Sequence, residues 1–84
     1  MKNAPAVSPF SCYVINGGLY LSSAVDVGNV YVEIENLTTG EITTTTVSNV
    51  QNGVVIPFNA DPGLYDLTLT ITSSGDQYGG SFNL

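Results

Sequence analysis

Residues 61–72, DPGLYDLTLTIT, decide the fold, because a tight turn leads there into a regular alternation of apolar and polar residues. A period of two is typical of a β-strand with one buried face. The side chains expected to point into a core are Tyr65, Leu67, Leu69 and Ile71. Those expected to point outward are Asp66, Thr68, Thr70 and Thr72. The turn before this strand is either a binding loop or a structural corner.

Strand signals recur along the rest of the chain at intervals of about ten residues, separated by turn-forming clusters. The further strands expected are 10–15, 19–24, 30–36, 42–47, 53–58 and 78–84. With 64–72 they predict one all-β domain over 10–84, a seven-stranded antiparallel β-sandwich of the immunoglobulin or fibronectin-III kind. Residues 1–9 contain Pro5 and Pro9 and are expected to form a flexible arm.

Glycine and proline mark where these strands turn or end. Asn16-Gly17-Gly18 predicts a tight hairpin turn, since Asn and Gly accept positive φ. Gly40 is suited to the left-handed position of a longer hairpin loop. Pro57 cannot donate to a ladder, so its strand ends there or runs along a sheet edge.

Two other strands differ in how clearly their sequence shows which side chains point into the core. Ile42 and Val47 have opposite parity, so their strand either contains a bulge or is an edge strand with a loosely specified register. The residues of the last strand that share one face are Tyr78, Gly80, Phe82 and Leu84.

Asp61, Gly63 and Tyr65 enter the sixth of the seven expected strands with the pattern D-x-G-x-Y. Immunoglobulin-like sandwiches carry a tyrosine near the start of that strand, and its hydroxyl bonds to backbone upstream. These three residues are therefore predicted to form a structural corner. Leu67 stands where an antibody domain has its second cysteine, with Leu21 as its expected counterpart. Replacing Tyr65 by phenylalanine is expected to cost about 0.5–1.5 kcal/mol, or more if a buried partner is left unpaired.

Residues 10–84 resemble a family of small secreted immunoglobulin-like domains of unknown function from Bacteroides-type gut bacteria. The resemblance rests on GGLYLSSAVDVGNVYVEIENLTTGEI, on VVIPF followed by PGLYDLTLT, and on the closing DQYGGSFNL. A weaker resemblance is to C-terminal sorting modules of secreted proteins in the same phylum, whose basic tail is missing from SFNL. Neither family brings an established catalytic site.

The charge balance excludes several classes of function. Lys2 is the only basic residue, there is no Arg or His, and seven acids give a net charge of −6. Binding to nucleic acid or to anionic lipid requires basic side chains that this chain lacks. Without histidine there is no usual general base, and no groove is implied for a carboxylate pair drawn from Asp61, Asp66 and Asp76. We expect no enzymatic activity and no cofactor.

The remaining chemistry is sparse. Cys12 has no partner for an intramolecular disulfide and is expected to be a small buried hydrophobe. Asp61 and Asp76 lie in turns that could offer oxygen ligands to calcium, but there is no dense acidic run and no metal site is predicted. Asn36 begins an NLT glycosylation sequon, which matters only in an organism that uses it.

The expected location is secreted, periplasmic or in the cell envelope. Few charges and many Thr, Ser, Asn and Gly residues suit such a surface. Met1-Lys2 is followed by NAPAVSP rather than by an apolar signal core, so the chain is either intracellular or, as we favour, a mature form without its signal peptide. No apolar run is long enough for a membrane-spanning helix.

The best candidate binding surface is the outward side of the third and sixth strands, if these two strands pair. It comprises Tyr31, Glu33, Glu35, Asp66, Thr68 and Thr70. Tyr20 is expected to face outward from the other sheet. The preferred function is a non-enzymatic, monomeric interaction module of the adhesion type, with an unknown protein or glycan partner. The alternative is a small carbohydrate-binding domain in which Tyr31 stacks on a sugar.

Overall fold

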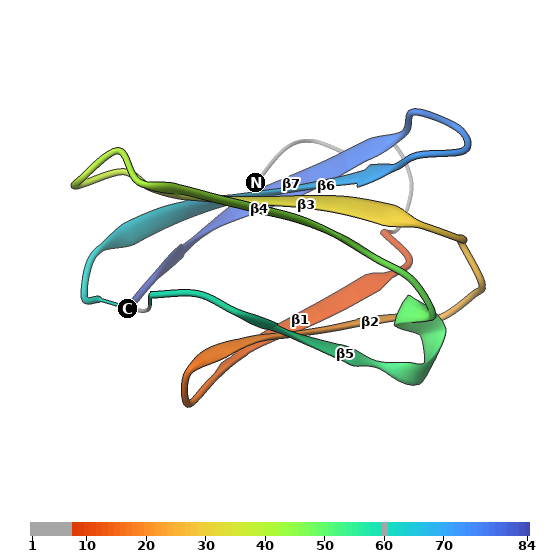
Figure 1. Cartoon of the computed structure of the whole chain (residues 1–84), viewed down its shortest axis with the longest axis horizontal. Helices are drawn as coiled ribbons and strands as arrows, with labels where there is room; N and C mark the ends of the chain where they lie inside the picture. The colour runs from red at the N-terminus through yellow and green to blue at the C-terminus, as the bar shows by residue number, and fades with distance from the viewer. Residues whose placement is uncertain (1–7, 60) are drawn as a thin grey trace.

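The computed structural model describes residues 8–59 and 61–84. Within these residues, seven strands form two antiparallel sheets that pack face to face (Figure 1). The strands are β1 (Phe10–Ile15), β2 (Gly18–Ser23), β3 (Val30–Asn36), β4 (Ile42–Val47), β5 (Val54–Pro57), β6 (Leu64–Ile71) and β7 (Gln77–Asn83). The predicted seven-stranded β-sandwich is confirmed.

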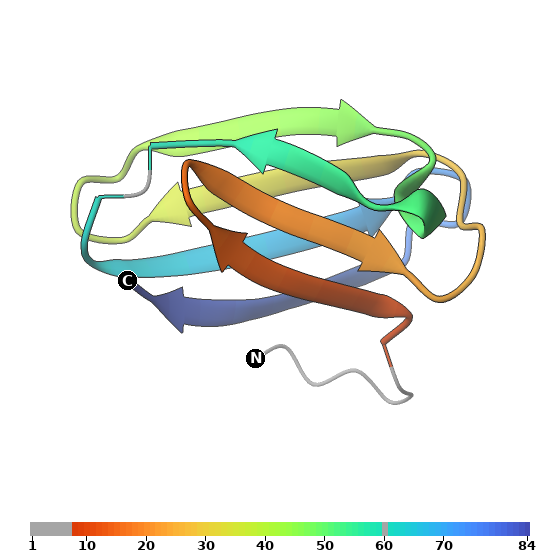
Figure 2. The ribbon, with the colours of Figure 1, turned by 90° about the horizontal axis from the view of Figure 1, so that it is seen from below.

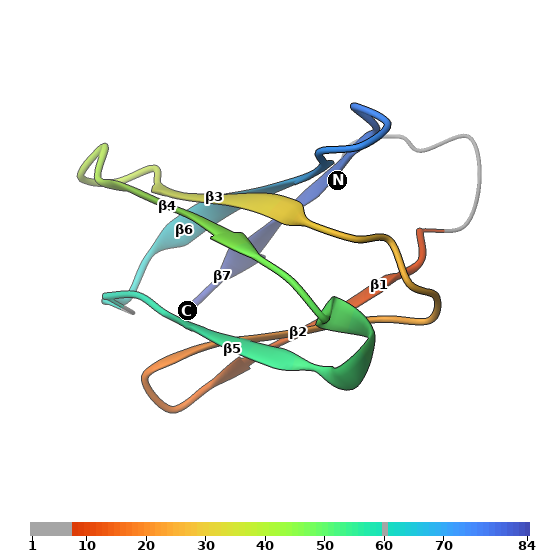
Figure 3. The ribbon, with the colours of Figure 1, turned by 45° about the vertical axis from the view of Figure 1, so that its right-hand side comes forward.

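One sheet has the order β1-β2-β5, and the other has the order β4-β3-β6-β7. Figure 2 shows the smaller sheet lying across the larger one, and Figure 3 shows the separation of the two layers. Strands β1 and β2, β3 and β4, and β6 and β7 pair as antiparallel neighbours in sequence. The chain changes sheet between β2 and β3, between β4 and β5, and between β5 and β6.

The core lies between the sheets and follows the alternation in the sequence. Along β6, every second side chain from Tyr65 to Ile71 is buried, and β3 buries Val30, Val32 and Ile34 in the same way. The main core cluster contains Leu19, Leu21, Val30, Val32, Ile34, Val50, Ile56, Tyr65, Leu67 and Leu69. Leu21 and Leu67, the expected apolar counterparts, both belong to it.

A short 3₁₀ turn, η1 (Val50–Asn52), was not predicted from the sequence. It follows Asn49, which has a left-handed backbone conformation with φ of 56°. The turn delivers Val50 into the core at 1% exposure. A segment of three residues has no measurable periodicity, which explains why the strand pattern concealed it.

The strand boundaries differ from the expected ones by single residues, and the open alternatives are resolved. Strand β4 is an edge strand, and its pairing with β3 runs from Val47 opposite Val30 to Ile42 opposite Glu35 without an interruption. Ile42 therefore points outward and is 53% exposed. Strand β5 is also an edge strand, and it ends at Pro57.

The segment that enters β6 is held by the Tyr65 hydroxyl. This hydroxyl lies 2.6 Å from the Asp61 carbonyl oxygen, to which it donates, and 3.1 Å from that of Asn59. It also accepts a hydrogen bond from Asn36 Nδ2 at 3.3 Å. Gly63 has a φ of 148°, and its N–H and C=O both pair with the backbone of Leu84. The bend is thus tied to β3 and to the end of β7.

Three aromatic rings close the core beside this bend. Tyr65 stacks on Phe82 with ring centroids 5.2 Å apart. Phe58 meets both rings edge-on, at 5.6 Å from Tyr65 and 6.3 Å from Phe82. Edge-to-face and offset-stacked contacts are the favoured aromatic geometries, so this cluster adds to the simple burial of the rings.

The Tyr65 hydroxyl is expected to make the stability of the fold decrease at alkaline pH. Burial raises the pKa of Tyr65 above its ordinary value, and the carboxylates of Asp61 and Glu41 raise it further. Above pH about 10, the unfolded chain therefore loses this proton while the folded chain keeps it, and stability falls as pH rises. We expect denaturant unfolding between pH 9 and 11 to show a smaller loss of stability in Tyr65→Phe than in the wild type. Equal losses would contradict this assignment.

The expected arm over 1–9 lies mostly outside the described residues. Ser8 and Pro9 are the described residues of this arm. The Pro9 carbonyl oxygen accepts a hydrogen bond from the Ala24 N–H at 2.9 Å, and Ser8 Oγ accepts one from the Phe10 N–H at 3.2 Å. The first of these bonds ties the chain just before β1 to the residue that follows β2, and the second is local.

Candidate functional site

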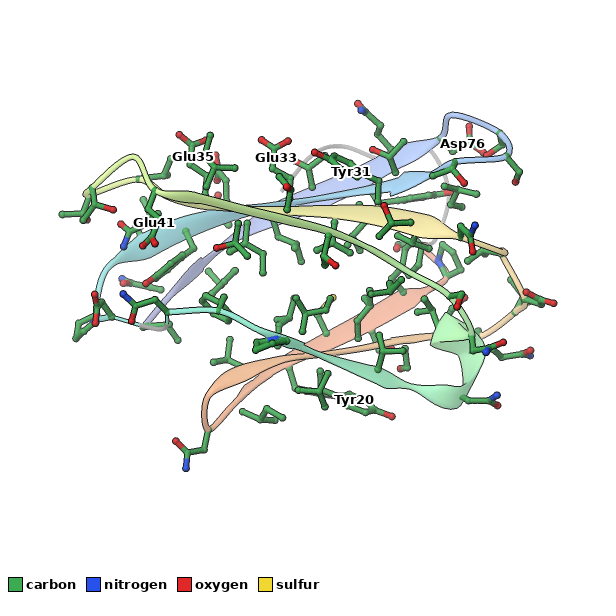
Figure 4. The ribbon with its side chains drawn as sticks, in the orientation of Figure 1. Tyr20, Tyr31, Glu33, Glu35, Glu41 and Asp76 are labelled. Atoms are coloured by element: carbon green, nitrogen blue, oxygen red, sulfur yellow. The ribbon has the colours of Figure 1, made fainter. Side chains whose placement is uncertain are left out.

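The pairing of β3 with β6 brings the six predicted surface residues together. Tyr31 lies opposite Thr70, Glu33 opposite Thr68, and Glu35 opposite Asp66. Figure 4 shows Tyr31, Glu33 and Glu35 projecting from the outer side of the four-stranded sheet, away from the core. These six residues, with Thr44, Thr46, Gln77, Gly79 and Ser81 beside them on β4 and β7, are called the acidic face below.

The residues from β4 and β7 were missing from the sequence prediction. The parity of β7 could have supplied Gln77, Gly79 and Ser81, whereas the facing of β4 is fixed only by its pairing with β3. The strand register places Thr46 and Thr70 on either side of Tyr31, and Gln77 beside Thr70. Two hydroxyls and one amide therefore lie in line with the Tyr31 ring across the sheet. Gln77 Nε2 donates to Thr70 Oγ1 at 3.3 Å. These groups widen the face from two strands to four.

A hollow of about 220 Å³ lies on the acidic face at β6 and β7. Its polar lining residues are Asp66, Thr68, Gln77 and Ser81, and Leu67, Tyr78, Gly79 and Gly80 complete the lining. A Cβ atom on Gly79 would lie 2.7 Å from the Leu67 carbonyl oxygen, so the backbone leaves no room for a side chain there. The glycine therefore creates a shallow polar depression on an otherwise filled sheet.

The carboxylates on this face are close to one another and have no cation beside them in the described residues. Glu35 lies directly opposite Asp66, an arrangement of like charges that costs stability. Ser81 Oγ donates to Asp66 Oδ1 at 2.8 Å and offsets part of this cost. Since Lys2 is the only basic side chain in the sequence, most of the acids are left for solvent or a partner to neutralise.

The three aspartates considered for catalysis or calcium are not brought together. Asp66 lies in β6, whereas Asp61 precedes this eight-residue strand and Asp76 follows it. At about 3.4 Å per residue, the strand separates Asp61 from Asp76 by more than 20 Å. Among residues 8–59 and 61–84, no three acidic or cysteine side chains gather closely enough to hold a metal ion.

Asn36, the first residue of the NLT sequon, is only 4% exposed. Its Nδ2 donates to the Tyr65 hydroxyl, and its Oδ1 accepts from the N–H groups of Thr38 and Thr39 at 2.9 and 3.2 Å. The amide is thus part of the folded framework, and a glycan on it is incompatible with these contacts.

Cys12 is half-buried, and burial raises the pKa of its thiol above the ordinary value. It lines an apolar cleft of about 300 Å³ between β1 and β7. Phe10 and Tyr78 meet edge-on there, with ring centroids 5.5 Å apart. A raised pKa keeps the thiol protonated and weakly nucleophilic, which suits a packing role.

The opposite outer surface, on the three-stranded sheet, carries two tyrosines that the sequence analysis did not connect. Tyr13 and Tyr20 are cross-strand partners, with ring centroids 6.2 Å apart and planes at 26°. Figure 4 shows Tyr20 on the side of the molecule opposite Glu33 and Glu35. We call this surface the tyrosine face; it comprises Ser11, Tyr13, Ile15, Tyr20, Ser22, Val55 and Pro57.

The fold agrees with that of a solved protein. The structure of a DUF3244 family protein from Bacteroides vulgatus, described as an immunoglobulin-like β-sandwich, matches with a TM-score of 0.73 and 20% identity. The match covers 92% of this chain and 84% of that one. The chain has an immunoglobulin-like β-sandwich fold. No protein-family model and no curated protein matches the sequence.

The immunoglobulin-like β-sandwich presents its two outer sheet surfaces with different chemistry: one is acidic and hydroxylated, the other is uncharged and aromatic. In the part of the chain that the structure describes, no helix has the length and apolarity needed to cross a bilayer.

Proposed function

We propose that this chain is a non-enzymatic interaction module of the adhesion type, which binds its partner through the acidic face. The observation that carries the proposal is the cross-strand juxtaposition of two like charges, Glu35 and Asp66, of which Asp66 receives one hydrogen bond from Ser81. Such an arrangement costs stability in the free domain. A partner that donates hydrogen bonds or positive charge to these oxygens would recover that cost.

The proposed setting is the secreted fraction or the cell envelope, and the proposed relatives are the small secreted immunoglobulin-like domains that the sequence resembles. The likeness to the DUF3244 protein from Bacteroides vulgatus supports the proposed relatives. The low content of charged residues, 10% of the chain, supports an extracytoplasmic setting.

Neutralising the acidic face tests the adhesion proposal. Beads coated with Glu33→Gln/Glu35→Gln/Asp66→Asn are expected to lose most of the adhesion that wild-type beads show to protein-coated or cell-derived surfaces. A matched control, Asp26→Asn/Glu41→Gln/Asp76→Asn, removes the same number of charges from connecting segments. The control should adhere like the wild type. Equal loss in both variants would mean that net charge alone matters, and equal retention would rule out the acidic face.

Carbohydrate binding is the second candidate, and the hollow beside Gly79 favours it. A carboxylate, an amide and two hydroxyls surround the depression, and these are groups that bond sugar hydroxyls. Tyr31, 38% exposed in the neighbouring strand, could stack on the apolar side of a sugar ring.

A glycan array followed by titration separates this candidate from protein binding. Any glycan bound by the wild type should lose at least about tenfold in affinity with Tyr31→Ala, since one good contact is worth about 1.4 kcal/mol or more. Tyr31→Phe keeps the ring and should keep most of the affinity. Affinity unchanged by Tyr31→Ala would exclude this residue, and an array without a bound glycan would remove the candidate.

We also infer that Asp61, Gly63 and Tyr65 serve as the structural corner of the domain and take no part in binding. The hydrogen bond from the Tyr65 hydroxyl to the Asp61 carbonyl oxygen, four residues upstream, supports this role. The 1% exposure of Tyr65 supports it as well.

A further inference from the structure

We propose that the tyrosine face is a docking surface for a second copy of this chain, and that the protein forms a weak dimer through it. The inference is independent of the proposed function, because it uses the opposite sheet. Its starting point is the apolar exposure of this surface: Tyr13 is 62% exposed, Val55 55% and Ile15 39%. Contiguous exposed apolar groups, with tyrosine prominent among them, are typical of protein contacts.

The tyrosine face is already arranged for docking. Tyr20 lies over Gly53, where a Cβ atom would collide with the tyrosine hydroxyl. Gly53 thus leaves room for the ring of Tyr20, and the ring of Tyr13 stacks against it. Stacking restricts the rotamers that the two rings adopt, which reduces the entropy lost when a partner covers them.

Charge favours a second copy as the occupant. The outward residues of β1, β2 and β5 carry no charge, although the chain has a net charge of −6. Three acids lie on the opposite outer surface, and Asp26, Glu41, Asp61 and Asp76 lie in the segments between strands. Contact between two tyrosine faces therefore keeps the carboxylates of both copies far apart. Any other pairing of surfaces from two copies brings acids closer together.

The geometry fits a symmetric pair of small extent. Two bare sheet faces can stack at about 10 Å, as the two sheets within the domain do. A two-fold axis would set Tyr13 and Tyr20 of one copy against the same patch of the other. The face spans three strands of six, six and four residues, so we infer a small interface and a transient dimer that depends on concentration. The monomer expected from the sequence is then the dilute state.

A sugar fits this face less well than a second copy does. Recognition of sugars requires several polar groups around the aromatic ring. Here Val55, Ile15 and Pro57 lie on the same face as the tyrosines, with two hydroxyls from Ser11 and Ser22 and no carboxylate or amide. Those polar groups are on the acidic face instead.

Sedimentation equilibrium of the full chain over a wide concentration range tests the proposal. The weight-average mass should rise from 8.8 kDa toward twice that value, and added salt should strengthen association by screening the repulsion between the copies. Val55→Glu should weaken the dimer at least about tenfold, because symmetry introduces the buried charge twice. Val25→Glu is the matched control: Val25 is 53% exposed but lies in the β2–β3 segment, and its variant should dimerise like the wild type.

Circular dichroism of each variant confirms that the fold is retained. A mass that stays monomeric up to about 1 mM, the range of very weak complexes, overturns the proposal. So does a dimer that survives Val55→Glu, since it would use a sheet edge or another surface. Glycan binding that is lost with Val55→Glu in a strictly monomeric protein would assign the face to sugars instead.

Discussion

Replacing Leu21 by alanine is expected to lower the free energy of unfolding by about 2–5 kcal/mol. Leu21 is completely buried in β2, on the core side of the three-stranded sheet, and it belongs to the same cluster as Leu67. The substitution removes three buried carbons and leaves a cavity that the sandwich can close only in part. A domain of 84 residues typically has about 4–13 kcal/mol of stability, so the variant would lose a large share of it.

Urea denaturation followed by circular dichroism measures this change. Val25→Ala serves as the control, because Val25 is 53% exposed and its truncation should cost no more than about 0.5 kcal/mol. If Leu21→Ala cost as little as the control, Leu21 could not be the centre of the contact between the sheets. Leu67→Ala should show a comparable loss, and the double variant should lose less than the sum if the two side chains touch.

Tyr65→Phe is expected to cost about 1–3 kcal/mol, which is more than the sequence alone suggested. The substitution keeps the stacked ring but removes the bond to the Asp61 carbonyl oxygen. It also leaves Nδ2 of Asn36, which is 4% exposed, without the hydroxyl that accepts its hydrogen bond. An unsatisfied buried donor costs more than the net value of one hydrogen bond.

Thermal unfolding provides a sensitive measurement, since each kcal/mol shifts the midpoint by about 4–8 °C in a domain of this size. Tyr31→Phe is the matched control, because it removes the same atom from an exposed tyrosine on the sheet surface. A midpoint unchanged by Tyr65→Phe would contradict the structural corner. A double-mutant cycle with Asn36→Ala isolates the Tyr65–Asn36 coupling, because the bonds from Thr38 and Thr39 to Asn36 Oδ1 are lost with and without the Tyr65 hydroxyl.

The sequence predicts most where one physical signal dominates. Strand β3 was predicted with its observed bounds, because Val30, Val32 and Ile34 alternate strictly with polar residues and a single register buries all three. The orientation of strand β4 was ambiguous, because threonine is equally suited to the core side and the solvent side of a strand. Only pairing with β3 fixes its register. Val50 was missed because its burial depends on a three-residue turn rather than on a period.

The candidate surfaces show the same division. The outward residues of β3 and β6 follow from alternation, and their side-by-side placement requires only that the two strands pair. The hollow around Gly79 could not be predicted, since it depends on the distance between that residue and the Leu67 carbonyl oxygen. The Tyr13–Tyr20 pair could have been found, because a two-residue connection at Asn16-Gly17 sets residue 13 opposite residue 20.

The acidic face and the tyrosine face lie on opposite outer surfaces of the sandwich, and this geometry determines the valency of any assembly. A domain held through its tyrosine face leaves its acidic face uncovered. Two copies joined there would direct their acidic faces away from each other, so that both could not engage one flat surface. Such a pair would act as a cross-linker between two opposing surfaces, and it would gain no avidity from a single one.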